Sequence, residues 1–92
     1  MTNAQSVWIF VGAGGKFPAG VFGSVSPAEE WISKHSLTGI LTKCSVGVGT
    51  FDEAVREGTF SPRNEREKSP EFIGRFSSAS QEHFHYEDGE RV

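Results

Sequence analysis

Residues 7–22 read VWIFVGAGGKFPAGVF, two apolar runs separated by a glycine-rich segment. Successive side chains of an extended strand point to opposite faces, so Trp8 and Phe10 share one face of the first run and the aliphatic residues share the other. We predict that Gly12–Pro18 turns the chain and that Ala19–Gly23 returns as a second strand. This hairpin is the start of the sheet.

The glycines of this segment do not match a nucleotide-binding motif. A dinucleotide fingerprint has a third glycine at the start of a helix, but Phe17 stands at that place and a strand follows. A phosphate-binding loop has Ser or Thr after its lysine, whereas Phe17 follows Lys16. We therefore interpret Gly12–Pro18 as a turn, with small-molecule binding at Gly12–Gly20 as the weakest alternative. Lys16 and Phe17 at its tip are candidates for contact with a partner.

Three later segments predict helices. Ser26-Pro27-Ala28-Glu29 and Thr50-Phe51-Asp52-Glu53 have the pattern of capping boxes, and Ser69-Pro70-Glu71 repeats the cap-then-proline start. The apolar stripe after Ser69 predicts a third helix that continues to Ala79. Strands are expected at Ile40–Val46 and His83–Glu87.

The predicted order is β-β-α-β-α-α-β. It indicates an α+β two-layer sandwich of about four short, mostly antiparallel strands, with the helices packed on one face. The second face of the sheet is then partly open, and Trp8 and Phe10 are expected to contribute to it.

Size and composition favour one small domain. The chain has 92 residues, which predicts a single α+β domain over 1–92 with frayed ends at 1–5 and 89–92. Eight Phe and two Trp predict an aromatic core. The net charge of −3 and the absence of a basic stripe argue against nucleic-acid binding. No apolar run is long enough for a membrane span or a signal peptide, so we expect a cytoplasmic protein.

The histidines offer a possible metal site. His83, His85 and Glu87 alternate along the last predicted strand and share one face, where two imidazoles and a carboxylate can ligate a divalent ion. Cys44 and His35 are further candidate ligands. The alternative is a strand that shows these polar side chains to water. Cys44, the one cysteine, forms no internal disulfide and fits a buried apolar thiol better than a nucleophile.

No catalytic set is visible, because helix caps and a solvated tail explain the carboxylates. We interpret the chain as a non-enzymatic protein-binding or regulatory module that requires no cofactor. Trp8, Phe10, Lys16 and Phe17 are the candidate contacts with an unknown protein partner. Divalent-metal binding at His83 and His85 is the alternative function. The protein is expected to be a monomer or a homodimer.

Several segments together resemble a small bacterial domain family of uncharacterised function. The resemblance covers most of the chain through WIFVGAGGKFP at 8–18, AEEWI at 28–32, LTG at 37–39, SPEFI at 69–73 and QEHFHYEDG at 81–89. It implies a small stand-alone bacterial protein. It implies no activity, ligand or catalytic residue.

Overall fold

The computed structural model describes residues 5–92. The chain forms two compact units, the first from residues up to 46 together with 82–92, and the second from 47–81. The first unit is called here the sheet unit and the second the helical unit. In sequence, the helical unit is inserted between two strands that are neighbours in the sheet of the sheet unit.

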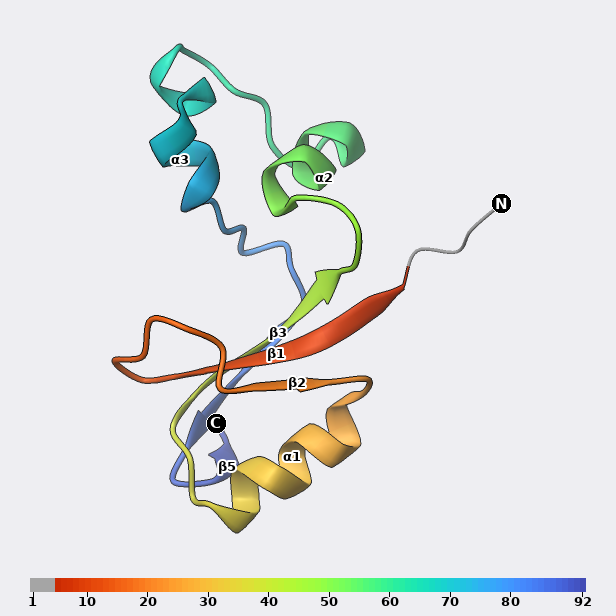
Figure 1. Cartoon of the computed structure of the whole chain (residues 1–92), viewed down its shortest axis with the longest axis vertical. Coiled ribbons are helices and arrows are strands. Elements are labelled where there is room, and N and C mark those ends of the chain that lie inside the picture. Colours follow the sequence, from red (N-terminus) through yellow and green to blue (C-terminus); the bar gives the residue numbers. More distant parts are fainter. Residues whose placement is uncertain (1–4) are drawn as a thin grey trace. The chain divides into compact units, whose positions relative to one another are not determined.

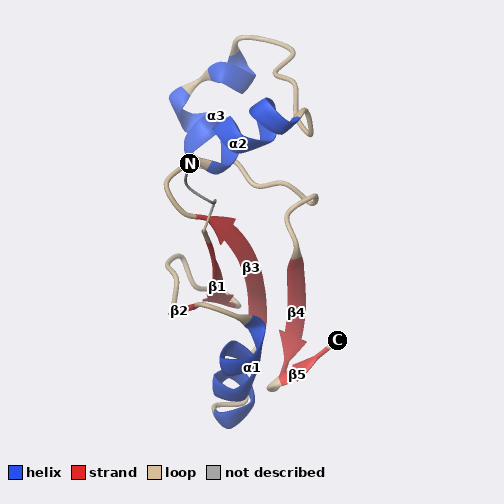
Figure 2. Ribbon diagram, turned by 90° about the vertical axis from the view of Figure 1, so that its right-hand side faces the viewer, coloured by secondary structure: helices blue, strands red, loops and turns tan. Residues whose placement is uncertain are grey.

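The sheet unit contains one antiparallel five-stranded sheet in the order β2-β1-β3-β4-β5 and one α-helix, α1 (Figure 1). The elements are β1 (Ser6–Gly12), β2 (Gly20–Phe22), α1 (Val25–Lys34), β3 (Gly39–Ser45), β4 (His83–Glu87) and β5 (Glu90–Arg91). β3 and β4 lie side by side as neighbouring strands (Figure 2), although the whole helical unit separates them in sequence.

The predicted hairpin is confirmed. β1 pairs with β2 in antiparallel register, with Trp8 opposite Phe22 and Phe10 opposite Gly20. The turn uses a positive φ of 79° at Gly14, a conformation that glycine adopts without steric cost. No helix begins after the glycines, so the chain returns as an extended strand.

The core of the sheet unit lies between α1 and one face of the sheet. Its fully buried side chains include Phe10, Ile32 and Leu41, and Trp8 and Tyr86 join the same cluster. Figure 1 shows α1 alongside β2 on one side of the sheet. Phe10 packs edge-on against Trp31 at 5.7 Å, and Trp8 stacks on Phe84 at 5.6 Å. Aromatic rings therefore fill most of this core, as the composition predicts.

Gly39 sets how closely β1 and β3 approach. A Cβ at this position would lie 2.7 Å from Cζ of Phe10 and would also overlap the carbonyl oxygen of Val11. Because the backbone oxygen cannot move aside as a flexible side chain can, only glycine fits the position.

The C-terminal residues 89–92, which were expected to fray, form a turn and a short strand in the structure, whereas residues 1–4 of the other expected frayed end lie outside the described residues. Asp88 and Gly89 have φ angles of 50° and 88°, as in the tight turns that fit the twist of a β-hairpin. The chain therefore returns as β5, which pairs with the end of β4. Val92 N–H also donates to the carbonyl of His85 at 3.0 Å.

The helical unit contains α2 (Thr50–Glu57), the 3-10 helix η1 (Arg66–Lys68) and α3 (Pro70–Gly74). Gly58 ends α2 with a left-handed φ of 80°. Four phenylalanines make mutual ring contacts at centroid distances of 5.0 to 6.3 Å, namely Phe51, Phe60, Phe72 and Phe76. They form the apolar centre of this unit.

The predicted helix starts are correct in part. Ser69 caps α3, since its hydroxyl accepts a hydrogen bond from Phe72 N–H at 3.2 Å. The helix ends at Gly74, far short of the predicted Ala79. α1 begins one residue before Ser26, with Ser24 as its N-cap and no side-chain cap bond, so the predicted capping box does not form. α2 likewise begins without a side-chain cap bond.

Candidate functional site

One face of the sheet carries no helix of the sheet unit; it is called here the open face. The strand register places Ile9 of β1 between Val21 of β2 and Thr42 of β3. It also places Ile40 between Val11 and His85. Since Trp8 and Phe10 point toward α1, these alternate residues point the other way. The open face therefore consists of an apolar centre with histidines along one side.

Large apolar side chains of the open face are accessible. Val21 is 60% exposed and Ile40 is 40% exposed, while Ile9 and Val11 are half-buried. Glu87 and Glu90 face each other in the β4–β5 pairing, and both are exposed. This pairing continues the face beyond the histidines, so an acidic border lies on its β5 side.

A pocket of about 430 Å³ opens at one end of the sheet. Three segments form its walls: the glycine segment at 12–14, the start of β3 at 38–40, and the end of β4 together with Val92. Val11, Ile40 and Val92 supply apolar surface, and His85 and Glu87 supply polar groups. Two regions that the sequence singled out separately thus share one pocket.

The backbone of the glycine segment forms hydrogen bonds within the protein. Ala13 N–H donates to the carbonyl of Thr38 at 2.9 Å, and Gly15 N–H donates to that of Gly12 at 2.8 Å. Ala19 N–H donates to the carbonyl of Phe10 at 2.8 Å as the chain enters β2. These amides close the turn, and no helix N-terminus is present there to bind a phosphate.

The four predicted partner contacts divide into two pairs. Trp8 and Phe10 are 7% and 1% exposed, so they are core residues that stabilise the sheet unit and do not reach the surface. The reason is the direction of the strand pleat, which turns both rings toward α1. Lys16 is exposed, and Phe17 is 79% exposed at the tip of the glycine segment. This segment leads directly from the wall of the pocket to Phe17.

The predicted metal ligands are brought together in part. The rings of His83 and His85 lie 5.2 Å apart, and both side chains are exposed. His35 lies on α1 with its ring 5.9 Å from that of Trp31, and the thiol of Cys44 is 3.9 Å from the carbonyl oxygen of Thr42. Within residues 5–92, no group of three or more His, Cys, Asp or Glu side chains has a geometry suited to a metal ion.

A polar cluster that the sequence did not indicate joins α1 to the C-terminal strands. Tyr86 O–H donates to Oε2 of Glu29 at 2.6 Å, and Arg91 Nε donates to the same oxygen at 2.9 Å. The Arg91 guanidinium also lies 3.9 Å from the centre of the Phe84 ring, a cation–π contact. Glu29 was interpreted as a capping residue, but its partners lie more than fifty residues away in sequence.

Burial and hydrogen bonding together shift the pKa values of this cluster. Burial and the hydrogen bond to Glu29 raise the pKa of Tyr86 to about 12. The same hydrogen bond, together with Arg91, lowers the pKa of Glu29 below its ordinary value. Tyr86 is therefore protonated and Glu29 ionised at neutral pH, as in a structural link between two elements.

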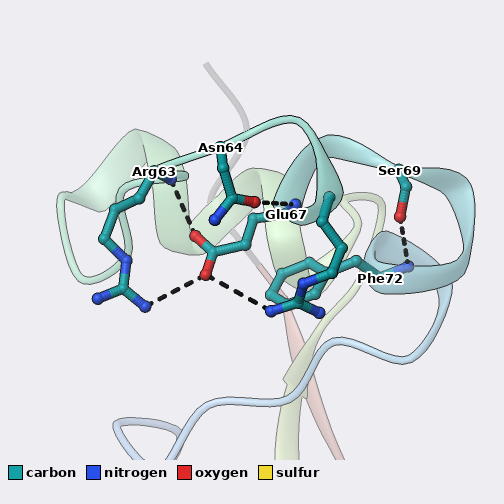
Figure 3. A network of polar contacts seen from close by, with 6 residues as sticks. Arg63, Asn64, Glu67, Ser69 and Phe72 are labelled. Atoms are coloured by element: carbon teal, nitrogen blue, oxygen red, sulfur yellow. Dashed lines mark hydrogen bonds and ion pairs between the residues drawn. The ribbon is translucent and has the colours of Figure 1, made fainter.

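A second polar network lies inside the helical unit (Figure 3). Glu67 is buried, and its carboxylate accepts hydrogen bonds from the amide of Arg63 at 2.9 Å and from its guanidinium at 3.2 Å. Asn64 accepts a hydrogen bond from Glu67 N–H at 3.0 Å. The backbone hydrogen bond from Arg63 is the main cause that lowers the pKa of Glu67. The sequence pattern predicted only a charged loop here.

Within residues 5–92, every helix is too short or too polar to cross a lipid bilayer. Comparison with curated proteins found no match, and comparison with solved structures found none either. A family model, described as a domain of unknown function (DUF7710), matches residues 7–92. This match spans both compact units and includes the open face, the pocket and the helical unit. The chain therefore belongs to the DUF7710 family.

Proposed function

We propose that the protein is a non-enzymatic protein-binding module and that the open face of its sheet is the docking surface. The observation that carries the proposal is the exposure of Val21 and Ile40 on a sheet face that no helix of the sheet unit covers. Contiguous exposed apolar surface on a small protein marks an interaction site. We retain the two-layer arrangement as part of this proposal, with α1 covering one face and the partner covering the other.

The pocket and the glycine segment extend this surface at one end of the sheet. A large apolar side chain of the partner fits the pocket, since Val11, Ile40 and Val92 line it. Phe17, which is 79% exposed, supplies an aromatic ring of this protein that contacts the partner. Deep apolar anchors and exposed aromatic rings contribute most of the binding energy at protein interfaces.

The charges bordering the open face select the partner. Glu87 and Glu90 are exposed on the β5 side, and the whole chain has a net charge of −3. We therefore expect a partner protein with an apolar patch flanked by Lys or Arg. The resemblance implies that this partner is bacterial, and we propose that the two proteins meet in the cytoplasm. Complementary charges of this kind raise the association rate and fix the orientation of the partner.

The test is site-specific photo-crosslinking in cells of the source organism. A benzoylphenylalanine at Val21 should give a reproducible adduct with a protein that mass spectrometry identifies. The control places the same group at Lys34, an exposed position on α1. Equal adducts at both positions, or adducts only at Lys34, would contradict the proposal. An adduct of the chain with itself would show that the partner on the open face is a second copy of this protein.

A second candidate function is divalent-metal binding by the histidine pair, which the 5.2 Å separation of the His83 and His85 rings favours. The two imidazoles alone are expected to bind Zn²⁺ at one equivalent in calorimetry. His85→Gln should abolish this binding, and His35→Gln on α1 should leave it unchanged. Absence of any heat of binding would exclude this function.

A further inference from the structure

The helical unit contains a larger pocket, of about 730 Å³, that the proposed function does not use. Its apolar lining comes from Phe60, Phe72 and Phe76, three of the four rings at the centre of the unit. Phe60 and Phe72 are stacked at 5.8 Å, and Phe60 and Phe76 are 5.0 Å apart. The volume lies within the range of small-molecule sites, whose walls are mostly apolar and aromatic.

Two arginines, Arg66 and Arg75, line the same pocket. Arg66 lies over the Phe72 ring, with its guanidinium carbon 5.5 Å from the ring centre. Its approach to Glu67 is a long one, at 4.0 Å, because that carboxylate is already bonded more closely by Arg63. A guanidinium carries five N–H donors, so Arg66 retains donors that neither Glu67 nor the Phe72 ring uses.

The charge of the lining is positive. Glu71 is the one acid among the lining residues, and Arg75 forms no ion pair with it or with any other carboxylate in the described part of the chain. A guanidinium can form two parallel hydrogen bonds with a carboxylate. These charge-assisted bonds are stronger than the hydrogen bonds that a neutral group would form. Aromatic walls beside such a group suit a ligand with a ring and an acid on one molecule.

We propose that this pocket binds a small aromatic carboxylate. The ring of the ligand packs against Phe60, Phe72 and Phe76, and its carboxylate accepts hydrogen bonds from Arg75 and Arg66. This site lies wholly within the helical unit, so it is independent of the open face and of the partner protein proposed above. It gives the protein a ligand-binding activity in addition to protein binding.

The experiment titrates the isotopically labelled full chain with indole-3-acetate and follows the backbone amide signals by NMR. Saturable shifts should occur at 66–79 with a dissociation constant in the millimolar range or below. Indole-3-acetamide retains the ring and lacks the charge, and acetate retains the charge and lacks the ring. Each should bind about tenfold more weakly, since a charge-assisted hydrogen bond or a buried ring contributes about that factor.

Matched variants locate the charge contact. Arg75→Gln should weaken indole-3-acetate binding about tenfold and leave indole-3-acetamide binding unchanged. Arg56→Gln is the control, because this exposed arginine of α2 does not line the pocket. The spectrum of each variant without ligand shows whether it is folded. Equal binding of the acid and its amide, an equal loss in both variants, or no saturable shift would overturn the proposal.

Discussion

Replacing Tyr86 by Phe tests the link between α1 and the C-terminal strands. The substitution keeps the buried ring and removes one hydroxyl, which donates to Oε2 of Glu29 at 2.6 Å. A hydrogen bond to a charged group contributes about 1.5–3 kcal/mol. The Glu29 side chain is 35% exposed and keeps Arg91 as a partner, so water and Arg91 compensate in part. We therefore expect a loss of about 1.5 kcal/mol in the free energy of unfolding near neutral pH.

The pKa of Tyr86 gives the same link a pH dependence of known sign. Its pKa in the folded protein is about 12, against an ordinary value of 10.0. Because the folded state holds the proton more tightly, the stabilisation is complete below the unfolded pKa and is lost as pH rises through the folded pKa. The full difference corresponds to roughly 3 kcal/mol, of which about half is lost near pH 11.

The assay is direct because Tyr86 is the sole tyrosine of the chain. Tyrosinate absorbance in the near ultraviolet should report a pKa near 12 in the folded protein and near 10 in urea. Tryptophan fluorescence over the same pH range confirms that the protein is folded. Urea unfolding should show the destabilisation caused by Tyr86→Phe shrinking as pH rises toward 11. A tyrosine pKa near 10 in the folded protein would refute this account of the cluster.

Three further predictions concern the two cores. Gly39→Ala should lower the free energy of unfolding in urea by about 2–3 kcal/mol, because the added Cβ overlaps the neighbouring strand. The control is Gly23→Ala, which has open space around the added Cβ and should lower the same free energy by less than about 1 kcal/mol. Leu41→Ala should cost about 2–5 kcal/mol, since this side chain is fully buried, whereas Ile40→Ala on the open face should cost about 1 kcal/mol or less. Glu67→Gln should destabilise the helical unit and speed amide exchange at 63–76. Because the pKa of Glu67 is lowered in the folded state, its carboxylate stabilises the natural protein above the unfolded pKa, and this stabilisation is lost as pH falls. The variant has no such carboxylate, so this contribution to acid destabilisation should be absent from it.

The alternation of side chains was readable from the sequence, and it fixed the faces of the sheet correctly. The buried face contains Trp8 and Phe10, and the opposite face contains the aliphatic residues and the histidine pair. A period of two determines which residues share a face. It does not determine which face a helix covers, and for that reason the two rings were expected at the surface.

Local patterns were less reliable where a distant partner decides the outcome. Glu29 has the position of a capping residue, yet Tyr86 and Arg91 bind it from the other end of the chain. The short strand β5 has only two residues, too few for a periodic signal, and depends on the turn at 88–89. The burial of Glu67 similarly depends on the loop at Arg63, whose amide and guanidinium donate hydrogen bonds to its carboxylate.

The most direct test of the central claim is the affinity of the crosslinked partner for a variant of the open face. With purified partner in calorimetry, Val21→Glu should weaken binding at least about tenfold, because it places a charge at the apolar contact. Lys34→Glu makes an acidic change on the exposed side of α1 and should leave the affinity unchanged. Full affinity in the Val21 variant would show that the partner binds elsewhere and that the open face is not the docking surface.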